Sequence, residues 1–262
     1  MVSAMAGKDE YYNRAKQQGY RARSAYKLKQ LDREFDLIGH GDTVVDLGAA
    51  PGGWLQVAAE EAGRHGRVIG VDFQRIDAVE RGDAPVETIR GDMTEDETKA
   101  AIAEAADGRV DTVISDMAPN MTGEYNLDHA RSVHLARQAL ETATDLLGEG
   151  GNFAVKVFQG QDLDGFEDDV AREFAFSRRT SPDASRESSS EVYVVGKNRL
   201  TGPVRVGDVR DVEITGVGEE GDGIAKVEGF TLFVAGVEEG DEVRVEVTDV
   251  KPRFGFAEPI EE

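Results

Sequence analysis

The chain has 262 residues, a mass of 28.4 kDa and no cysteine, so disulfides, thiolate metal sites and cysteine nucleophiles are excluded. It carries 52 acidic and 30 basic residues, a net charge of -22, and 39% hydrophobic residues, which is enough for a folded core. No apolar stretch reaches 18 residues, and the first residues lack a hydrophobic signal segment. These features predict a cytoplasmic protein without a membrane span. The acidic excess is typical of adaptation to high salt.

One segment breaks the acidic pattern. Residues 11–30 contain six basic residues, no acidic residue and four of the six tyrosines. Because basic side chains neutralise phosphates and aromatic rings stack on bases, this segment is a candidate nucleic-acid surface. The alternative is an amphipathic helix whose tyrosines pack in the core. The candidate RNA contacts in this segment are Arg14, Lys16, Arg21 and Arg23.

Apolar, β-branched segments then alternate with helix-length amphipathic segments. Strands are expected at 42–48, 67–73, 85–92, 110–116, 152–158 and 191–197, and helices at 53–63, 94–108, 126–147 and 165–174. This order predicts an α/β domain of the Rossmann-like kind, with a parallel sheet and helices on both faces.

The pattern changes at about Leu200. The tail has short alternating strands and glycine turns but no helix-length segment, which predicts a small OB-like all-β barrel. We therefore expect two domains, 1–198 and 199–262. The tail holds six basic and sixteen acidic residues, a poor electrostatic surface for RNA. One face could still present RNA, and a structural or protein-contact role is the alternative. The residues proposed for that face are Arg205, Arg210, Lys226, Arg244, Lys251, Arg253, Phe230, Phe233, Phe254 and Phe256.

Ligands of open parallel sheets bind beyond the carboxyl ends of the strands. Four of the first five strand ends here carry an acidic residue, and the fifth carries Lys156. The first ends in the glycine-rich DLGAAPGGW, which lacks the GxGxxG cradle for a dinucleotide pyrophosphate and argues against an NAD-dependent oxidoreductase. Asp72 is placed to accept from ribose hydroxyls, and Asp92 from an adenine amino group. A nucleoside without phosphates fits, and S-adenosylmethionine is such a ligand.

Four segments carry a family resemblance. In order, DLGAAPGGW, SDMAPNMTG, VKVFQG and SSSEVYVVGK resemble the FtsJ-like family of RNA ribose 2'-O-methyltransferases, from about Tyr20 to Lys197. The resemblance implies a seven-stranded sheet whose antiparallel last strand is 191–197, S-adenosylmethionine as cofactor and no metal. It also implies a uridine of large-subunit ribosomal RNA as the target, within an assembled or assembling subunit. The tail from about Leu200 to Ile260 is similar to a TRAM domain, a small RNA-binding barrel.

The resemblance also implies site residues. Its catalytic Lys-Asp-Lys-Glu set falls on Lys27, Asp116, Lys156 and Glu191, and its cofactor contacts fall on Gly52, Trp54, Asp72, Asp92 and Asp116. We expect Lys156 to take the proton from the ribose 2'-hydroxyl. We expect Lys27 to lower the pKa of Lys156 by like-charge repulsion. The two acids would orient the ammonium groups and the ribose.

The remaining expectations concern substrate and partners. Segment 177–190 is either a flexible loop or an RNA-contacting lip, which adds Arg178, Arg179 and Arg186 as candidates. His129 and His134 stand five residues apart without an adjacent acid pair, so we expect no metal site there. The alternatives are the same chemistry on tRNA or an mRNA cap, and a non-catalytic ribosome-assembly factor. No obligate protein partner is indicated.

Overall fold

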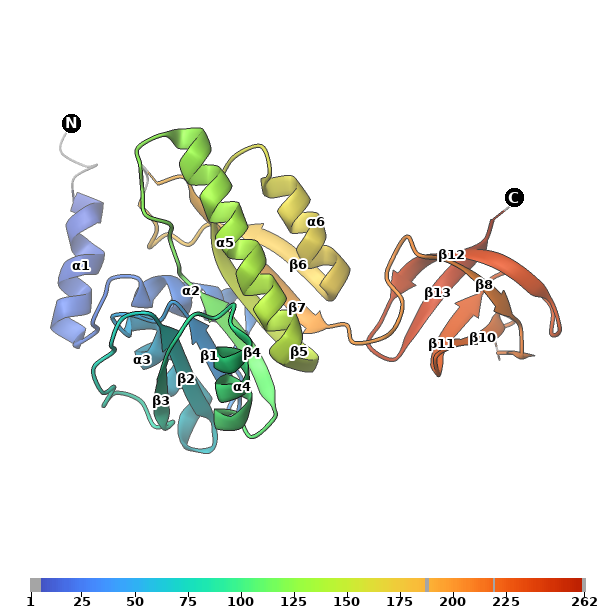
Figure 1. Cartoon of the computed structure of the whole chain (residues 1–262), viewed down its shortest axis with the longest axis horizontal. Helices are drawn as coiled ribbons and strands as arrows, with labels where there is room; N and C mark the ends of the chain where they lie inside the picture. Colours follow the sequence, from blue (N-terminus) through green and yellow to red (C-terminus); the bar gives the residue numbers. More distant parts are fainter. Residues whose placement is uncertain (1–5, 187–188, 219, 261–262) are drawn as a thin grey trace.

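The computed structural model describes residues 6–186, 189–218 and 220–260. An α/β domain is followed by an all-β domain, and the chain segment after the last strand of the first joins the two (Figure 1). Within the described ranges, none of the helices combines the length and the hydropathy that a membrane span requires. The predicted α/β fold with an all-β tail is confirmed.

A seven-stranded sheet forms the centre of the α/β domain, in the order β3-β2-β1-β4-β5-β7-β6. Strands β1 to β5 run parallel, and β7 is antiparallel to β5 and to β6, as expected for segment 191–197. The strands are β1 (Thr43–Leu47), β2 (Arg67–Asp72), β3 (Val86–Arg90), β4 (Val110–Ser115), β5 (Leu147–Phe158), β6 (Phe174–Thr180) and β7 (Glu191–Arg199).

Strand β6 was not predicted, and it corrects the expectation of a loop at the start of segment 177–190. Its sequence, FAFSRRT, carries two arginines and lacks a clean apolar alternation. The reason is its place in the sheet: it pairs only with β7, so it is an edge strand with most of its side chains at least partly exposed. Charged residues on edge strands discourage pairing with other chains.

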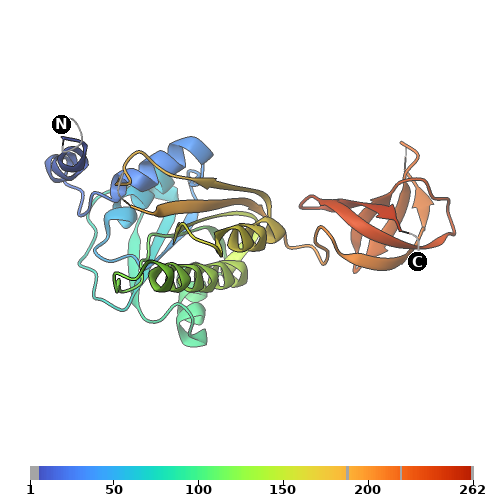
Figure 2. The same cartoon turned by 90° about the horizontal axis from the view of Figure 1, so that it is seen from above.

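Helices cover both faces of this sheet. Apolar side chains of α2 and α3 pack on one face, and those of α4, α5 and α6 pack on the other. Figure 2 shows α2, in blue, and α5, in green, on opposite sides of the sheet. The helices are α1 (Ala6–Gln18), α2 (Ala25–Phe35), α3 (Gly53–Ala62), α4 (Asp96–Ala105), α5 (Tyr125–Leu146) and α6 (Leu163–Glu173), with a 3-10 turn, η1, at Gly63–His65.

The alternation of side chains along the strands directs several polar residues toward α2. Val44 of β1 and Ile114 of β4 belong to the core beneath α2 and α3. Residues two positions further on share that face, which places Asp46 and Asp116 there. On the neighbouring antiparallel pair, Lys156 stands directly opposite Tyr193. A polar cluster between the sheet and α2 follows from this register.

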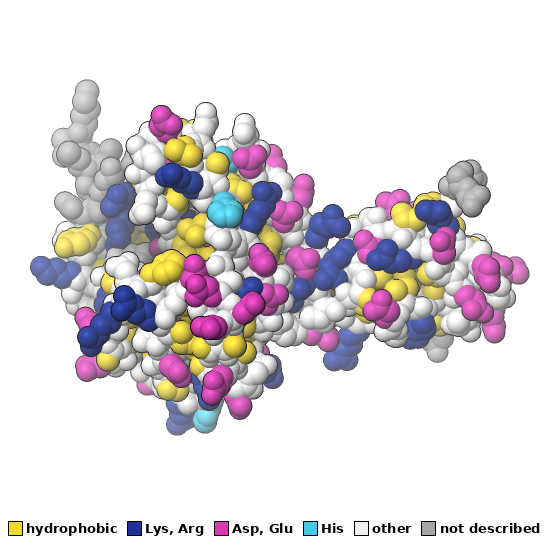
Figure 3. Space-filling model, in the orientation of Figure 1, with side chains coloured by type: hydrophobic (Ala, Val, Ile, Leu, Met, Phe, Trp, Pro, Cys, Tyr) yellow, Lys and Arg dark blue, Asp and Glu magenta, His cyan; other side chains and the backbone are white. Residues whose placement is uncertain are grey.

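The C-terminal domain is a curled six-stranded sheet in the order β8-β12-β13-β11-β10-β9, with its own apolar core. At the junction, Glu173 Oε2 lies 2.6 Å from Arg199 Nη1 and 3.2 Å from Arg205 Nη2. Figure 3 shows Lys and Arg side chains gathered where the two domains meet. The strands are β8 (Val209–Glu213), β9 (Gly216–Val217), β10 (Gly223–Val227), β11 (Phe230–Val234), β12 (Glu242–Val250) and β13 (Phe254–Pro259).

Candidate active site

A glycine-rich loop joins β1 to α3 and lies at the carboxyl edge of the sheet. Gly48 has φ +75°, and a Cβ at this position would lie 2.0 Å from Cγ of Met117. Only glycine therefore allows the loop after β1 to pack on the loop after β4. Gly52 has φ +102° and precedes the first turn of α3. The loop holds the start of a helix against the end of β4, where Asp116 follows.

Three acidic residues lie at or just after the carboxyl ends of β1, β2 and β3. Asp72, at the end of β2, accepts hydrogen bonds from the main-chain N–H groups of Ala50 (3.0 Å) and Gln74 (2.7 Å). Asp92, after β3, accepts from the main chain and hydroxyl of Thr94, at 2.9 and 2.8 Å. Both carboxyl groups are partly exposed. Each carboxylate oxygen has two lone pairs, so both side chains retain capacity to accept from a ligand.

Asp46 is the third acid. It is the acidic residue at the end of the first strand, but sequence reasoning assigned it no role. The side chain is buried, and its Oδ2 atom has no hydrogen-bond partner among the described residues. Burial raises the pKa of Asp46 well above its usual value, and the nearby carboxylates of Asp116 and Asp72 add to the shift. The available signal was an acid inside the apolar segment TVVDL, where a buried carboxyl needs a reason.

These side chains suit a particular class of ligand. The two partly exposed carboxylates of Asp72 and Asp92 offer acceptors for amino and hydroxyl groups, and they disfavour phosphate. Phe73, which directly follows Asp72, is 67% exposed and offers a flat apolar face. The residues present therefore fit a nucleoside that carries positive charge, such as S-adenosylmethionine.

Four ionisable side chains meet beneath α2. Lys27 Nζ lies 2.6 Å from Glu191 Oε1 and 3.8 Å from Asp116 Oδ1. Lys156 Nζ lies 3.0 Å from the same oxygen of Asp116 and donates to its main-chain carbonyl at 2.5 Å. Both lysines are less than a tenth exposed. Two ammonium and two carboxylate groups balance in charge, which makes their joint burial tolerable. The structure thus brings together the four residues of the predicted Lys-Asp-Lys-Glu set.

Tyr193 belongs to the same cluster, and sequence reasoning missed it too. Its hydroxyl donates to Asp116 Oδ1 at 2.5 Å, and Lys27 Nζ lies 5.7 Å from its ring centroid. Burial and the carboxylates of Asp116 and Glu191 raise the pKa of Tyr193 well above its usual value, so the phenol remains a donor. Its signal was its spacing, because a residue two positions after Glu191 shares the same strand face.

Trp54 is buried rather than open to a ligand. Its side chain is part of the core, its ring stacks on Tyr193 at 5.9 Å between centroids, and its Nε1 donates to the carbonyl of Ser24 at 2.8 Å. The indole thus packs α3 against the segment before α2. A contact between Trp54 and a cofactor would have to come from its main chain, in the first turn of α3.

The basic residues of segment 11–30 divide into two groups. Arg21 donates to the carbonyls of Pro51, Asp77 and Ala78, and Arg23 donates to that of Ala184, so these two hold loops together. Arg14 lies over the ring of Tyr26, and Lys16 is exposed on α1. Of the four tyrosines, Tyr20 and Tyr26 are buried, Tyr11 is partly buried, and Tyr12 is 57% exposed. The core-packing alternative therefore holds for Tyr20 and Tyr26.

The basic residues of segment 177–190 are also partly engaged. On β6, Arg179 pairs with Asp164 at 2.5 Å and Glu167 at 2.6 Å, and Arg178 Nη1 lies 3.9 Å from Glu34. Arg186 is exposed on the following loop, whose residues 187–188 lie outside the described residues.

His129 has a structural environment. Its Nε2 accepts from the main-chain N–H of Asp162 at 3.1 Å, so its Nδ1 carries the proton and donates to the carbonyl of Phe158 at 2.9 Å. The imidazole thus fixes the loop after β5, while His134 is exposed. Across the described part of the chain, no group of three His, Asp or Glu side chains is arranged to hold a metal ion.

Comparisons with known proteins agree with this geometry. Residues 20–199 match the family model of FtsJ-like methyltransferases, and residues 203–260 match that of the TRAM domain. The chain is 64% identical to a protein named Ribosomal RNA large subunit methyltransferase E from Haloarcula marismortui, over 98% of this chain and 100% of the relative. It is 65% identical to a protein of the same name from Natronomonas pharaonis, with the same coverage.

A solved structure supports the fold. A chain described as a ribosomal RNA methyltransferase from Plasmodium falciparum is 26% identical and superposes with a TM-score of 0.61, covering 69% of this chain and 98% of that one. The family model covers the α/β domain and includes all four members of the Lys-Asp-Lys-Glu set. On these grounds the chain belongs to the FtsJ-like methyltransferase family and carries a C-terminal TRAM domain.

Proposed function

We propose that this protein transfers a methyl group from S-adenosylmethionine to the ribose 2'-hydroxyl of a uridine in large-subunit ribosomal RNA, in the cytoplasm. The observation that carries the proposal is the buried, charge-balanced cluster of Lys27, Asp116, Lys156 and Glu191 beside the glycine-rich loop. The names of the relatives support ribosomal RNA as the substrate. The uridine and the 2'-oxygen rest on the resemblance to the family.

The cofactor would lie at the carboxyl ends of β1, β2 and β3. Asp72 and Asp92 would accept from its ribose and adenine, the main chain at Gly52 and Trp54 would approach it closely, and Asp116 would border it. When bound, S-adenosylmethionine supplies a methyl group activated by a positively charged sulfur.

Lys156 would hold the proton of the 2'-hydroxyl. A ribose hydroxyl is a weak nucleophile until a base takes its proton, and only a neutral lysine can take it. Asp116 Oδ1 fixes Lys156 Nζ at 3.0 Å, and the positive charge of Lys27 lies 3.8 Å from the same oxygen. Glu191 binds Lys27 at 2.6 Å and keeps that charge in place. Positioning at this precision is worth several orders of magnitude in rate.

The two domains would divide the work. We propose that residues 1–198 carry the reaction and that residues 199–262 present RNA. The main support for the second part is the match to a TRAM domain.

A methyl-transfer assay tests the proposal. Labelled S-adenosylmethionine is offered in high salt with large ribosomal subunits from a strain lacking the protein, with naked ribosomal RNA and with tRNA. The modified position is mapped by its resistance to alkaline cleavage. The expected result is one 2'-O-methyluridine in the large-subunit RNA. Label in tRNA alone would keep the chemistry and refute the substrate, and no label despite cofactor binding would favour an assembly factor.

Two lysine variants serve as controls in that assay. Lys156→Ala should lower kcat by about 10²- to 10⁴-fold, the usual contribution of a general base. Lys99→Ala removes a lysine that is likewise paired with one aspartate, Asp145 at 2.6 Å, but lies outside the cluster on α4. It should leave turnover unchanged. A Lys156→Ala protein that binds cofactor and turns over near the wild-type rate would refute the assignment of Lys156 as the base.

A further inference from the structure

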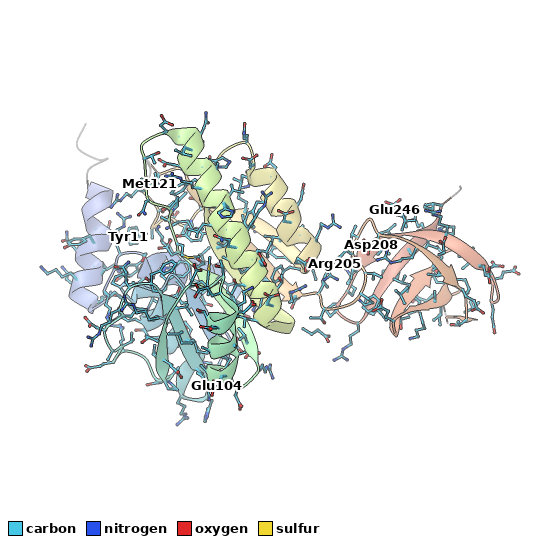
Figure 4. All side chains as sticks on the ribbon, viewed as in Figure 1. Tyr11, Glu104, Met121, Arg205, Asp208 and Glu246 are labelled. Carbon is cyan, nitrogen blue, oxygen red and sulfur yellow. The ribbon has the colours of Figure 1, made fainter. Side chains whose placement is uncertain are left out.

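Large apolar side chains are exposed on the segment that leads from β4 into α5. Met121 is 62% exposed and Tyr125 is 59% exposed. Figure 4 shows Met121 on the loop that enters α5. Both follow Asp116 closely in the chain, at the edge of the sheet where the charged cluster lies. Exposed apolar groups beside a site mark a surface that binds a partner or substrate.

Tyr125 is joined to the strands that carry the other members of the cluster. Its hydroxyl donates to the carbonyl of Gln159 at 2.7 Å, and the main-chain N–H of Gln159 donates to the carbonyl of Ser190, also at 2.7 Å. Gln159 directly follows β5, which carries Lys156, and Ser190 directly precedes Glu191. The tyrosine ring therefore stands at the rim formed by the loops after β4, after β5 and before β7.

The loop that presents these side chains is fixed from below. The buried carboxylate of Asp128 accepts three hydrogen bonds, from the main chain and hydroxyl of Thr122 (both 2.8 Å) and from the main chain of Gly123 (3.0 Å). These bonds lower the pKa of Asp128, which keeps the carboxylate charged. Met121 and Tyr125 are thus held in place before a ligand arrives, which reduces the entropic cost of binding.

Tyr125 lies away from the carboxyl ends of β2 and β3, where the cofactor is proposed to bind. Phe73, another large exposed aromatic residue, follows β2 beside Asp72. Tyr125 is bonded to the loop after β5, and β1 and β4 lie between these two strands. A ligand that meets Lys156 from the side of β5 and β7 would meet Tyr125.

We propose that Tyr125, supported by Met121, is the platform on which the base of the target nucleotide, or of its direct neighbour, stacks while the ribose lies over Lys156. The inference rests on the proposed function. Proteins read single-stranded RNA by stacking splayed bases on aromatic rings, and the thioether of Met is a suitable soft neighbour. The adjacent Glu124 is exposed and would repel a phosphate, so a base is the better occupant. Tyr125 is a positioning residue in this scheme.

The test compares Tyr125→Ala with Tyr125→Phe in the methyl-transfer assay. Stacking on one aromatic ring contributes about 1–3 kcal/mol by alanine substitution, which corresponds to about 5- to 150-fold. Tyr125→Ala should raise KM for RNA by this factor, with a smaller change in kcat and unchanged affinity for S-adenosylmethionine. Tyr125→Phe keeps the ring, loses only the bond to Gln159, and should stay within about threefold of the wild type. Phe176→Ala is the matched control, because Phe176 is 42% exposed on β6 and lies outside the candidate RNA-binding segments 11–30 and 177–190.

The outcomes separate the platform from other roles. If Tyr125→Phe is as defective as Tyr125→Ala, the hydroxyl acts by holding Gln159, and the stacking role is overturned. An equal rise in KM for Phe176→Ala would show a diffuse RNA surface and would overturn it as well. Affinity for a fluorescent uridine-containing oligonucleotide, measured on Lys156→Ala in the presence of cofactor, tests the platform without turnover. A binding loss on adding Tyr125→Ala there would support the platform even if the wild type methylated another RNA.

Discussion

Replacing Tyr193 by phenylalanine should damage the cluster without creating a cavity. The ring and its stacking on Trp54 remain, and only the hydroxyl that donates to Asp116 Oδ1 at 2.5 Å is lost. A hydrogen bond to a charged group contributes about 1.5–3 kcal/mol. Asp116 would then be held by the two lysines alone, and its carboxylate could turn away from Lys156.

Two measurements report this loss. The free energy of unfolding should fall by about 1.5–3 kcal/mol, which lowers the Tm of a domain of this size by about 3–12 °C. If the hydrogen bond from Tyr193 to Asp116 stabilises the transition state by this full amount, its loss lowers kcat by about 10- to 150-fold, at 1.36 kcal/mol for each factor of ten. The pKa of Tyr193 is raised, so the loss should be the same across the neutral range of pH.

Tyr20→Phe is a matched control outside the cluster. Tyr20 is 5% exposed, and its hydroxyl donates to a carboxylate, Glu60 Oε2, at 2.6 Å. This variant should lose a similar amount of stability and keep full turnover. The reasoning is refuted if Tyr193→Phe loses stability to the same extent as Tyr20→Phe while its kcat stays within twofold of the wild type.

Three further outcomes are expected. Burial and neighbouring carboxylates raise the pKa of Asp46 above 3.8, so the unfolded chain releases this proton first and wild-type stability is lost as pH rises through the raised pKa. Asp46→Asn should therefore gain stability relative to the wild type from about pH 4 upward in urea titrations; a constant difference at every pH would contradict this. Glu173→Gln leaves two largely buried arginines at the junction unneutralised and should cost about 1.5–3 kcal/mol in thermal unfolding. Glu167→Gln, whose partner Arg179 is more exposed, should cost less than about 1 kcal/mol. In the C-terminal domain, Phe256→Ala should weaken RNA binding by a factor that is nearly independent of salt, because the residue is 37% exposed in a cluster of three phenylalanines, whereas the effect of Lys226→Ala should fade as salt is added.

The sequence patterns predicted the central fold because the buried strands are short segments of apolar, β-branched residues. The segments at 42–48, 67–73 and 110–116 could be recognised one at a time, and their acidic ends pointed to one edge of a parallel sheet. Strand β6 was not predicted because an edge strand buries few of its side chains and therefore tolerates arginines. A local sequence pattern reveals a strand through its buried residues, and most side chains of β6 are at least partly exposed.

Two members of the site for which no role was predicted, Tyr193 and Asp46, are placed by the pairing of strands rather than by a local sequence pattern. Tyr193 faces Lys156 only because β7 pairs antiparallel with β5 in one particular register, and a slip of one residue would turn it to the other face. Asp46 stands next to Asp116 only because β1 and β4 are neighbours, although 70 positions separate the two residues in the chain. Neither relation can be read from a segment taken alone.

The charge of the chain and the chemistry of the site fit together. The cluster of Lys27, Lys156, Asp116 and Glu191 is balanced within itself, so it needs no counter-charge from the acidic surface around it. Part of the basic charge nearby, including that of Arg21, is used to bind main-chain carbonyls. The net charge of -22 opposes a long-range positive field that would attract RNA. At about 1 M salt the screening length is only about 3 Å, so neither the repulsion by the -22 net charge nor a basic patch acts at a distance. Recognition must then depend on contacts that salt does not weaken, which are stacking and hydrogen bonds at the rim of the site.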